Sequence, residues 1–367
     1  MRIGFVLYGD LSTRTGGFLY DRMLIRALQE RGVEVEIFQL PWRSYPLSLI
    51  KSSLSTNLDW MNTENVDLII EDELAHPSLI TANRMIRKQS GKPVVSLVHH
   101  LRSSEDHPEL LNRFYRRVEH QYLNTLDGVI ANSAPTLAAV RSTAQRELPA
   151  LVAPPGRDHF DTRISTTQIE ARSHQDGPLE VLFLGSVIPR KRLEDLIEAI
   201  AILSDVELRL TVVGRQSGSD GYVRGIKQLI RSRGLEGCVI WRGELPDDDL
   251  SRQLAGSHLL IVPSSHEGFG IAYLDAMGYG VVPVGTISGG ASTLIDHAET
   301  GFLISPGDIQ ALSEHMRRLA LDRELLNSMA LKALHRHQQQ PTWEEVTDTV
   351  YKYLRNTFME PRGMPRH

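Results

Sequence analysis

Short apolar runs alternate with longer amphipathic segments along nearly the whole sequence, and no other feature constrains its fold as strongly. The apolar runs are rich in β-branched residues and bounded by polar or turn-forming residues, which predicts buried strands. Continuous apolar strands that alternate with helices are typical of parallel sheets covered on both faces. The predicted strands are 3–7, 33–38, 67–70, 93–98, 128–131 and 150–153 in the first half, and 180–184, 208–213, 238–241, 258–262, 281–284 and 301–304 in the second.

The segments between these strands have the apolar spacing of helices. The segment 20–31 places Leu24, Ala27 and Leu28 on one face and ends at Gly32, a residue favoured just after the last helical turn. Two such series of strands and helices predict an α/β fold with two doubly wound domains. The other predicted helices are 109–125, 193–203, 222–233, 247–255, 271–278, 291–297 and 308–321.

The two series are separated by a polar segment with few periodic apolar residues, which is typical of a linker or an irregular surface segment. We predict a first domain at 1–160, a linker at 161–178 and a second domain at 179–340. A further helix is predicted at 341–358, where Thr342 and Glu345 form a capping box. The tail at 359–367 is predicted to be disordered.

Composition excludes several classes of protein. The chain has 367 residues, enough for about two domains, and its 40 Lys+Arg against 45 Asp+Glu argue against a nucleic-acid partner. The single cysteine, Cys238, excludes an internal disulfide and a cysteine zinc cluster, and most histidines lack metal-binding spacing, so no metal is expected. Neither a transmembrane stretch nor a signal peptide is recognised, so the expected location is the cytoplasm.

The loop after the first predicted strand ends in two adjacent glycines, Gly16 and Gly17. Glycine lets backbone N–H groups approach a ligand closely, and a helix N-terminus favours a phosphate. Because ligands bind at the carboxyl ends of strands in open α/β sheets, this loop is a candidate phosphate site. An ordinary flexible connection is the alternative interpretation.

Three consecutive cations, Arg190, Lys191 and Arg192, follow the strand 180–184 and Gly185. Lysine offers a point charge and arginine binds two oxygens at once, so this loop suits a diphosphate. A solvated basic helix start is the alternative, but cations at a helix N-terminus oppose the helix dipole. The position and the charge together favour anion binding.

The segment 263–280 carries two carboxylates, Glu267 in a loop and Asp275 eight positions later, about two helical turns away. The glycines at 268 and 270 expose backbone N–H groups beside the first acid. Carboxylates accept paired hydrogen bonds from adjacent hydroxyls such as those of sugars and ribose. Taken alone, Asp275 is more typical of the surface of an amphipathic helix than of a ligand site.

The stretch from Glu267 to Met277 resembles the signature of family 4 retaining glycosyltransferases, in which seven residues separate two acids. Other motifs of that family are matched in the same order. The resemblance covers nearly the whole chain and is densest from 181 to 308. The matching segments are Gly16-Gly17, His99-His100, 183–185 with 189–191, 212–214, 263–264, 289–290 and 301–308.

This resemblance implies an α/β fold of the GT-B type, with two Rossmann-like doubly wound domains facing a central cleft. The last helix would then cross back to the first domain. The implied reaction is retaining transfer of a hexose from a nucleoside-diphosphate sugar, with UDP-glucose as the guessed donor, to a hydroxyl of a glycan, lipid or small molecule. It would follow a front-face mechanism without metal or cofactor, because cationic side chains and helix dipoles neutralise the diphosphate.

The resemblance also assigns roles to individual residues. Lys191 matches the diphosphate-binding lysine and Glu267 the acid near the donor sugar, while Asp275 matches the acid that binds ribose. His99 or His100 matches a histidine close to the transferred sugar. The catalytic candidates are Glu267, His99, His100, Lys191 and Arg190, and the nucleotide-sugar-binding candidates are Gly16, Gly17, Gly185, Ser186, Gly214, Gly268, Phe269, Gly270, Ile271 and Asp275.

Two residues depart from the family pattern. Ser186 stands where the family often has arginine, so that either Arg190 or Arg192 compensates or the contact is absent. The second acid is Asp275 instead of glutamate, and its shorter side chain requires a closer backbone to reach ribose. These two departures support an alternative to the transferase, namely a catalytically degenerate nucleotide-sugar-binding subunit. A second alternative, which does not rest on them, is a GT-B nucleotide-sugar epimerase.

The acceptor side carries weaker signals. Residues 40–51 mix aromatic, apolar and basic side chains, which suits peripheral contact with the inner face of a membrane. A helix packed within the first domain has the same composition. The expected partners are thus a nucleotide-sugar donor and a hydroxyl acceptor, without nucleic acid, and the oligomeric state is left open.

Overall fold

The computed structural model describes residues 1–54, 58, 61, 63–161, 164–216 and 221–360. The chain divides into two compact units, which are described separately. Unit 1 comprises Met1–Gly156 together with the segment from Pro341 onwards, and unit 2 comprises Arg157–Gln340. Most of the tail predicted at 359–367 lies outside the described residues.

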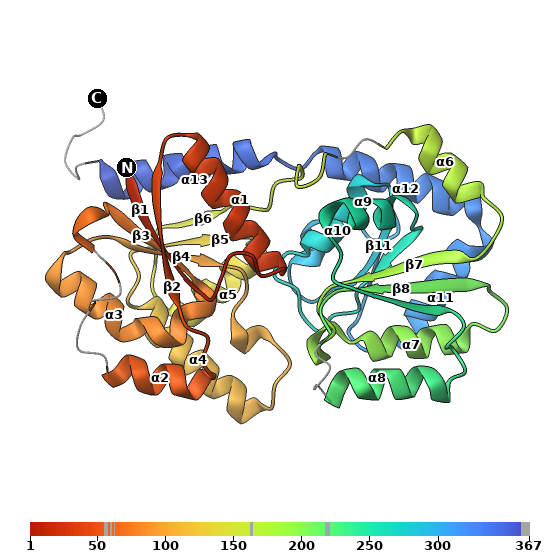
Figure 1. Ribbon diagram of the computed structural model, residues 1–367, viewed down its shortest axis with the longest axis horizontal. Coiled ribbons are helices and arrows are strands. Elements are labelled where there is room, and N and C mark those ends of the chain that lie inside the picture. Colours follow the sequence, from red (N-terminus) through yellow and green to blue (C-terminus); the bar gives the residue numbers. More distant parts are fainter. Residues whose placement is uncertain (55–57, 59–60, 62, 162–163, 217–220, 361–367) are drawn as a thin grey trace. The chain divides into compact units, whose positions relative to one another are not determined.

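Unit 1 is built on a six-stranded parallel sheet with the strand order β2-β1-β3-β4-β5-β6. Helices cover both faces of this sheet (Figure 1), so strands such as β3 and β4 are buried along their whole length. The strands are β1 Arg2–Tyr8, β2 Glu34–Leu40, β3 Leu68–Asp72, β4 Val94–Val98, β5 Gly128–Ala131 and β6 Ala150–Val152; the helices are α1 Gly16–Glu30, α2 Tyr45–Leu54, α3 His76–Gln89, α4 Glu109–Leu123, α5 Ala134–Ala144 and α13 Trp343–Leu354.

Unit 2 repeats this plan with the strand order β12-β11-β10-β7-β8-β9, again in a six-stranded parallel sheet between helices (Figure 1). Its core is a continuous cluster of buried apolar side chains from the strands and the helices that cover them. The strands are β7 Leu179–Leu184, β8 Leu208–Val213, β9 Val239–Gly243, β10 Leu259–Ile261, β11 Val282–Thr286 and β12 Phe302–Ile304; the helices are α6 Thr166–His174, α7 Leu193–Ile202, α8 Gly221–Ser232, α9 Asp247–Ala255, α10 Ile271–Gly278, α11 Ile309–Leu321 and α12 Arg323–Gln338.

The predicted strands are all present, and their ends agree with the structure to within two residues. The helix predicted at 291–297 is wrong: only a 3₁₀ turn forms, at Gly290–Thr293. The backbone N–H of Asp296 donates to the hydroxyl of Thr300 at 2.9 Å instead of continuing a helix. Ala298 then adopts a left-handed conformation, with φ of 64°, and the chain turns into β12.

The linker predicted at 161–178 is also wrong, because it contains helix α6. Ser165 and Gln168 form a capping box at its start, and Ile169 is fully buried. The other anchor is Arg172, whose buried guanidinium donates to the carbonyl oxygens of Ala255 at 2.9 Å and Gly280 at 2.6 Å. A helix that buries an arginine lacks the apolar period by which helices are recognised in a sequence.

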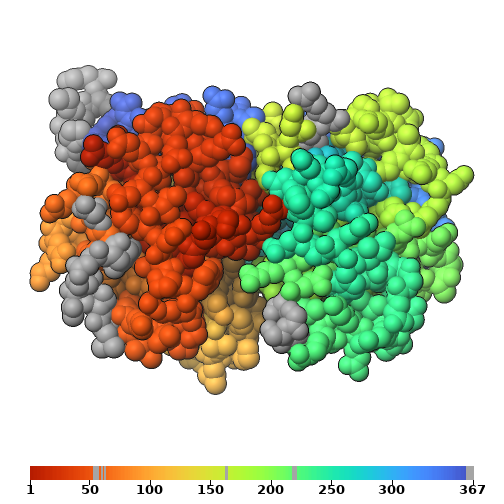
Figure 2. Space-filling view, in the orientation of Figure 1, coloured from red at the N-terminus to blue at the C-terminus, as the bar shows by residue number. Residues whose placement is uncertain are grey.

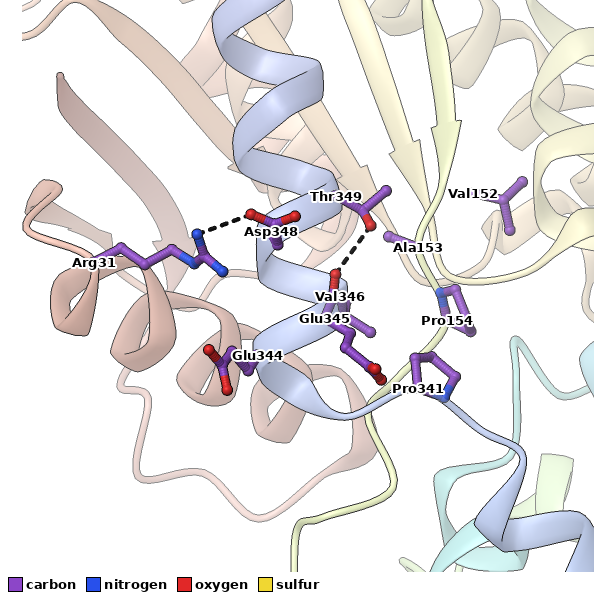
Figure 3. Close-up of a pocket in the computed structure, with 10 residues that line it drawn as sticks. All are labelled: Arg31, Val152, Ala153, Pro154, Pro341, Glu344, Glu345, Val346, Asp348 and Thr349. Carbon is purple, nitrogen blue, oxygen red and sulfur yellow. Dashed lines mark hydrogen bonds and ion pairs between the residues drawn. The ribbon is translucent and has the colours of Figure 1, made fainter.

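Helix α13 belongs to unit 1 although it follows unit 2 in the sequence. Its Trp343 ring packs edge-on against Tyr20 of α1, with 5.1 Å between ring centroids. Asp348 forms an ion pair with Arg31 at 2.9 Å, shown in Figure 3. Beside this ion pair lies a pocket of about 510 Å³, formed by α13, the end of α1 and residues 152–154, which contains none of the predicted site residues.

Replacing Arg172 with methionine tests whether α6 is an anchored part of unit 2. The variant leaves buried carbonyl oxygens without a donor, so the free energy of unfolding falls by about 3 kcal/mol. Arg317→Met is the matched control, since Arg317 makes an exposed ion pair with Asp205 that is worth about 1 kcal/mol or less. Urea denaturation measures both, and equal losses would contradict an anchoring role for α6.

Candidate active site

The loops that follow β7 and β10 are joined by a cluster of charged side chains in which Glu267 is buried and Lys191 and Arg190 are partly buried. The ammonium of Lys191 donates to Oε1 of Glu267 at 2.5 Å, and the hydroxyl of Ser264 donates to the same oxygen at 2.5 Å. A guanidinium nitrogen of Arg190 lies 3.6 Å from that oxygen and donates to the carbonyl of His266 at 2.7 Å. Because β10 pairs directly with β7, their carboxyl ends bring these loops together.

Two cations facing one carboxylate set the electrostatics of this cluster. Burial by itself would raise the pKa of Glu267, but the charges of Lys191 and Arg190 and two hydrogen bonds lower it to about 2. Ionised Glu267 therefore stabilises unit 2 above about pH 4, and this contribution is lost as the pH falls toward 2. Burial, reinforced by the Arg190 charge, lowers the pKa of Lys191, so that a bound anion would stabilise its charged form.

The structure separates the three cations that the sequence places together. Arg190 and Lys191 lie in the 3₁₀ turn Pro189–Lys191 and face Glu267. Arg192 instead pairs with Asp195 in the first turn of α7, at 2.6 Å and 3.0 Å. Arg192 thus has a structural role at a helix start, which leaves Arg190, beside Glu267, as the arginine that could compensate for Ser186.

Backbone contacts between loops explain the glycine pairs of this region. A Cβ on Gly214, at the end of β8, would lie 2.0 Å from the carbonyl oxygen of Gly185, at the end of β7. A Cβ on Gly289 would lie 2.0 Å from the carbonyl oxygen of Glu267, and one on Gly290 would lie 2.1 Å from that of Gly268. Only glycine permits these approaches, so the glycines hold the loops around Glu267 in place.

Helix α10 begins directly after the Glu267 loop. Its N-cap is Gly270, which has a φ of 96°, and Phe269 before it is buried. Ile271 and Asp275 both lie in this helix, and Asp275 is buried with its carboxylate 3.4 Å from Nδ1 of His159. His159 is not among the predicted site residues, because 116 residues separate it from Asp275 in the sequence.

A second cluster lies in unit 1, at the ends of β3 and β4. Nε2 of His99 lies 2.9 Å from Oδ1 of Asp21 in α1, and Asp72 follows close by at the end of β3. A Cβ on Gly17 would lie 3.1 Å from the His99 ring, so the glycine allows the helix start to approach this histidine. Of the predicted residues, the structure therefore brings Gly17 together with His99.

His100 points to different partners. Its Nε2 lies 2.9 Å from Oε1 of Glu105, whose other oxygen lies 3.3 Å from His107. Adjacent residues at the end of a strand point to opposite sides, which separates the two histidines. Only His99 joins the buried carboxylate cluster.

The charges around His99 favour its protonated form. Burial lowers its pKa, but the charge and hydrogen bond of Asp21 and the charge of Asp72 outweigh burial and raise the pKa of His99 above its ordinary value. Burial and the Asp21 charge in turn raise the pKa of Asp72, while the His99 charge acts against them. The second oxygen of Asp21 is buried and has no hydrogen-bond partner among the described residues.

Asp21 and Asp72 were not predicted as site residues. Asp21 lies four positions after Gly17, one helical turn into α1, and Asp72 directly follows an apolar strand, so both carried a positional signal. With His99 they place three ligand atoms within 4.8 Å of one another, a geometry that could also hold a metal ion. The predicted absence of a metal stays a prediction.

Comparison with known proteins assigns the C-terminal part of the chain. Residues 165–336 match the family model described as glycosyl transferases group 1. This segment is therefore similar to group 1 glycosyl transferases over slightly less than half of the chain. It contains the Lys191–Glu267 cluster, the glycine contacts and Asp275. Over 165 residues the chain is 32% identical to an N-acetyl-alpha-D-glucosaminyl L-malate synthase of Bacillus anthracis, a match that covers 44% of this chain and 42% of the relative.

Solved structures extend the similarity in fold to both units. A sucrose-phosphate synthase from Thermosynechococcus elongatus superposes with a TM-score of 0.82 over 98% of this chain and 99% of its own, at 20% identity. Anabaena HepE, solved with UDP and glucose, gives 0.76 over 97% and 100% of the two chains, at 22% identity. The chain therefore has the GT-B fold. Its matches to curated relatives span between 42% and 64% of their length.

Replacing Asp21 with asparagine tests the electrostatic model of the His99 cluster. The change removes a negative charge but keeps the size of the side chain, so we expect the pKa of His99 to fall. Nuclear magnetic resonance of histidine-labelled protein measures this pKa directly. Glu105→Gln is the control, because Glu105 contacts His100 and not His99; an unchanged His99 pKa in the Asp21 variant would contradict the model.

Proposed function

We propose that this protein is a retaining glycosyltransferase that moves a hexose from a nucleoside-diphosphate sugar to a hydroxyl acceptor. The observation that carries the proposal is the largely buried cluster of Lys191, Arg190 and Glu267 in the segment that matches the glycosyl transferase family model. This cluster places two partly buried cations beside one carboxylate, so positive charge is concentrated there. Such a charge suits a diphosphate, which carries negative charge and offers several oxygens.

The same cluster suits the chemistry of sugar transfer. Departure of the nucleoside diphosphate builds negative charge on its β-phosphate, and preorganised cations stabilise that charge most where water is excluded. Lys191 and Arg190 supply this stabilisation. Glu267 stays ionised and pairs with both cations, which makes it a weak nucleophile and a good acceptor for hydroxyl groups of the donor sugar. These properties favour a front-face mechanism, in which the departing phosphate helps to deprotonate the acceptor.

In unit 1, His99 is the proposed contact to the transferred sugar. A protonated imidazole held by Asp21 keeps Nδ1 as a hydrogen-bond donor for a sugar hydroxyl. The start of α1 at Gly16 and Gly17 offers backbone N–H groups to an anion. His100, which pairs with Glu105, is not included in this role.

UDP-glucose is the proposed donor. Anabaena HepE, which shares the fold, has been solved with UDP-glucose at a TM-score of 0.75 and 22% identity. Asp275 is the proposed ribose ligand, and His159 at 3.4 Å positions its carboxylate.

Contact of residues 40–51 with a membrane is part of the proposal for the acceptor side, since Trp42 and Ile50 are exposed there. No helix among the described residues is long and apolar enough to cross a membrane.

Purified protein incubated with UDP-glucose, UDP-galactose and GDP-mannose tests the reaction. We expect release of the nucleotide with one donor preferred, and a product that keeps the anomeric configuration of that donor. Interconversion of UDP sugars without an acceptor would instead indicate the epimerase, and nucleotide binding without turnover would indicate the degenerate subunit. Absence of both binding and turnover across the panel would refute the proposal.

Lys191→Met tests the role of the charged cluster. Loss of one preorganised cation should reduce kcat about a hundredfold or more, because the charge on the leaving phosphate is no longer stabilised. The matched control is Lys332→Met, since Lys332 makes an exposed ion pair with Glu299 in the same unit. Steady-state kinetics measures both variants, and equal activity in the two would remove Lys191 from the mechanism.

Chelation tests the proposal that no metal takes part. We expect EDTA to leave the transfer rate unchanged, because side chains of the protein already neutralise the diphosphate. A loss of activity that Mg²⁺ or Mn²⁺ restores would contradict metal independence. The Asp21–Asp72–His99 cluster would then be the first position to substitute.

A further inference from the structure

Helix α4 has an apolar face that packs into unit 1. Its buried side chains follow helical spacing and point toward the core behind β4 and β5. This buried face is sufficient to pack α4 within unit 1, so apolar side chains elsewhere on the helix are not needed for that packing. The buried residues are Tyr115, Val118, Glu119, Tyr122 and Leu123.

The first two turns of α4 carry a second set of apolar side chains, which point to solvent. Leu110 is 79% exposed, and Phe114, one turn later, is 44% exposed. Leu111 beside them is exposed as well. The outer face of a helix in a globular protein is ordinarily polar, so a stripe of large exposed apolar side chains marks a surface for interaction.

Arginines accompany this stripe. Arg113 and Arg117 lie one turn apart, next to Leu110 and Phe114 on the same side of the helix, and Arg116 lies beside them. All three are exposed. Long cationic side chains next to exposed leucine and phenylalanine can keep their charge in water while their stems cover apolar surface.

Helix α2 continues the same surface. Its first residue, Tyr45, packs edge-on against Phe114 and Tyr115 of α4, with ring centroids 6.2 Å and 4.9 Å away. Along α2, Ile50 is 56% exposed and Leu47 is exposed too. Figure 1 shows α2 and α4 on the same side of the sheet of unit 1, and both reach the surface in Figure 2.

We propose that this surface, the α2–α4 patch, docks the protein on an anionic lipid bilayer. The patch consists of Leu47, Ile50 and Lys51 of α2 and Leu110, Leu111, Arg113, Phe114, Arg116 and Arg117 of α4. Apolar side chains flanked by exposed cations have the composition of helices that lie in the interface of a membrane. The proposal extends beyond residues 40–51 and does not depend on the proposed reaction.

Charge complementarity selects the bilayer over a second copy of the chain. In a symmetric dimer the same patch would face itself, and the arginines of one copy would meet those of the other. An anionic lipid surface instead attracts each exposed cation. The formal net charge of the chain is -5, so the attraction depends on this local group of cations and not on the protein as a whole.

The test is sedimentation of the full chain with vesicles of phosphatidylcholine that contain about one third phosphatidylserine. We expect binding that weakens with salt and is much weaker on phosphatidylcholine alone. Arg113→Gln/Arg117→Gln should weaken binding about tenfold or more, since each cation contributes about fivefold near an anionic surface. Leu110→Ser/Phe114→Ser should weaken binding on the same vesicles by removing the inserted side chains.

Matched controls separate the patch from general surface properties. Arg26→Gln/Arg141→Gln removes two exposed cations from other helices of unit 1, and Ile287→Ser/Leu321→Ser removes two exposed apolar side chains from unit 2. Both should bind vesicles like the wild type. Thermal unfolding verifies that every variant is folded. Wild-type binding by the α4 variants, equal losses in the controls, or a patch-dependent dimer without vesicle binding would overturn the proposal.

Discussion

The candidate site of unit 2 depends on one interaction, in which the carboxylate of Glu267 is buried between two cations. An isolated buried carboxylate is strongly unfavourable, so Glu267 requires the cations that the loop after β7 provides. Neighbouring strands β7 and β10 place the two loops close enough for that contact. The interaction therefore holds the two loops together, and its two cations, Lys191 and Arg190, are the basis of the proposed diphosphate site.

Unit 1 has the opposite balance of charge at the carboxyl ends of its strands. There one imidazole, His99, stands between two buried carboxylates, Asp21 and Asp72. The first cluster suits the negative charge of a diphosphate, and the second suits hydrogen bonds to hydroxyl groups. Both arise from the rule that loops at the carboxyl ends of parallel strands carry the ligand sites of α/β sheets. Two similar folds thus acquire different chemistry through a few side chains.

The strands were predictable because most of them are buried on both faces and therefore appear as uninterrupted apolar runs. Helices were harder to predict where their buried faces are polar: α6 buries Arg172, α3 buries Asn83, and α12 buries His337. Each of these side chains finds hydrogen bonds to distant parts of the fold, which the local sequence does not reveal. The helix predicted at 291–297 failed for a related reason, since the Thr300 hydroxyl takes a backbone N–H that a helix would need.

The sequence by itself determined the order of strands and helices and the edge of each sheet where charged residues gather, since both follow from local patterns. The tertiary structure decided which of those residues meet. It joined Lys191 to Glu267 across 76 positions and His99 to Asp21 across 78, and it gave Arg192 and His100 other partners. The physical reason is that a buried charge must be compensated by whatever side chain the fold brings beside it, and sequence spacing does not record that neighbour.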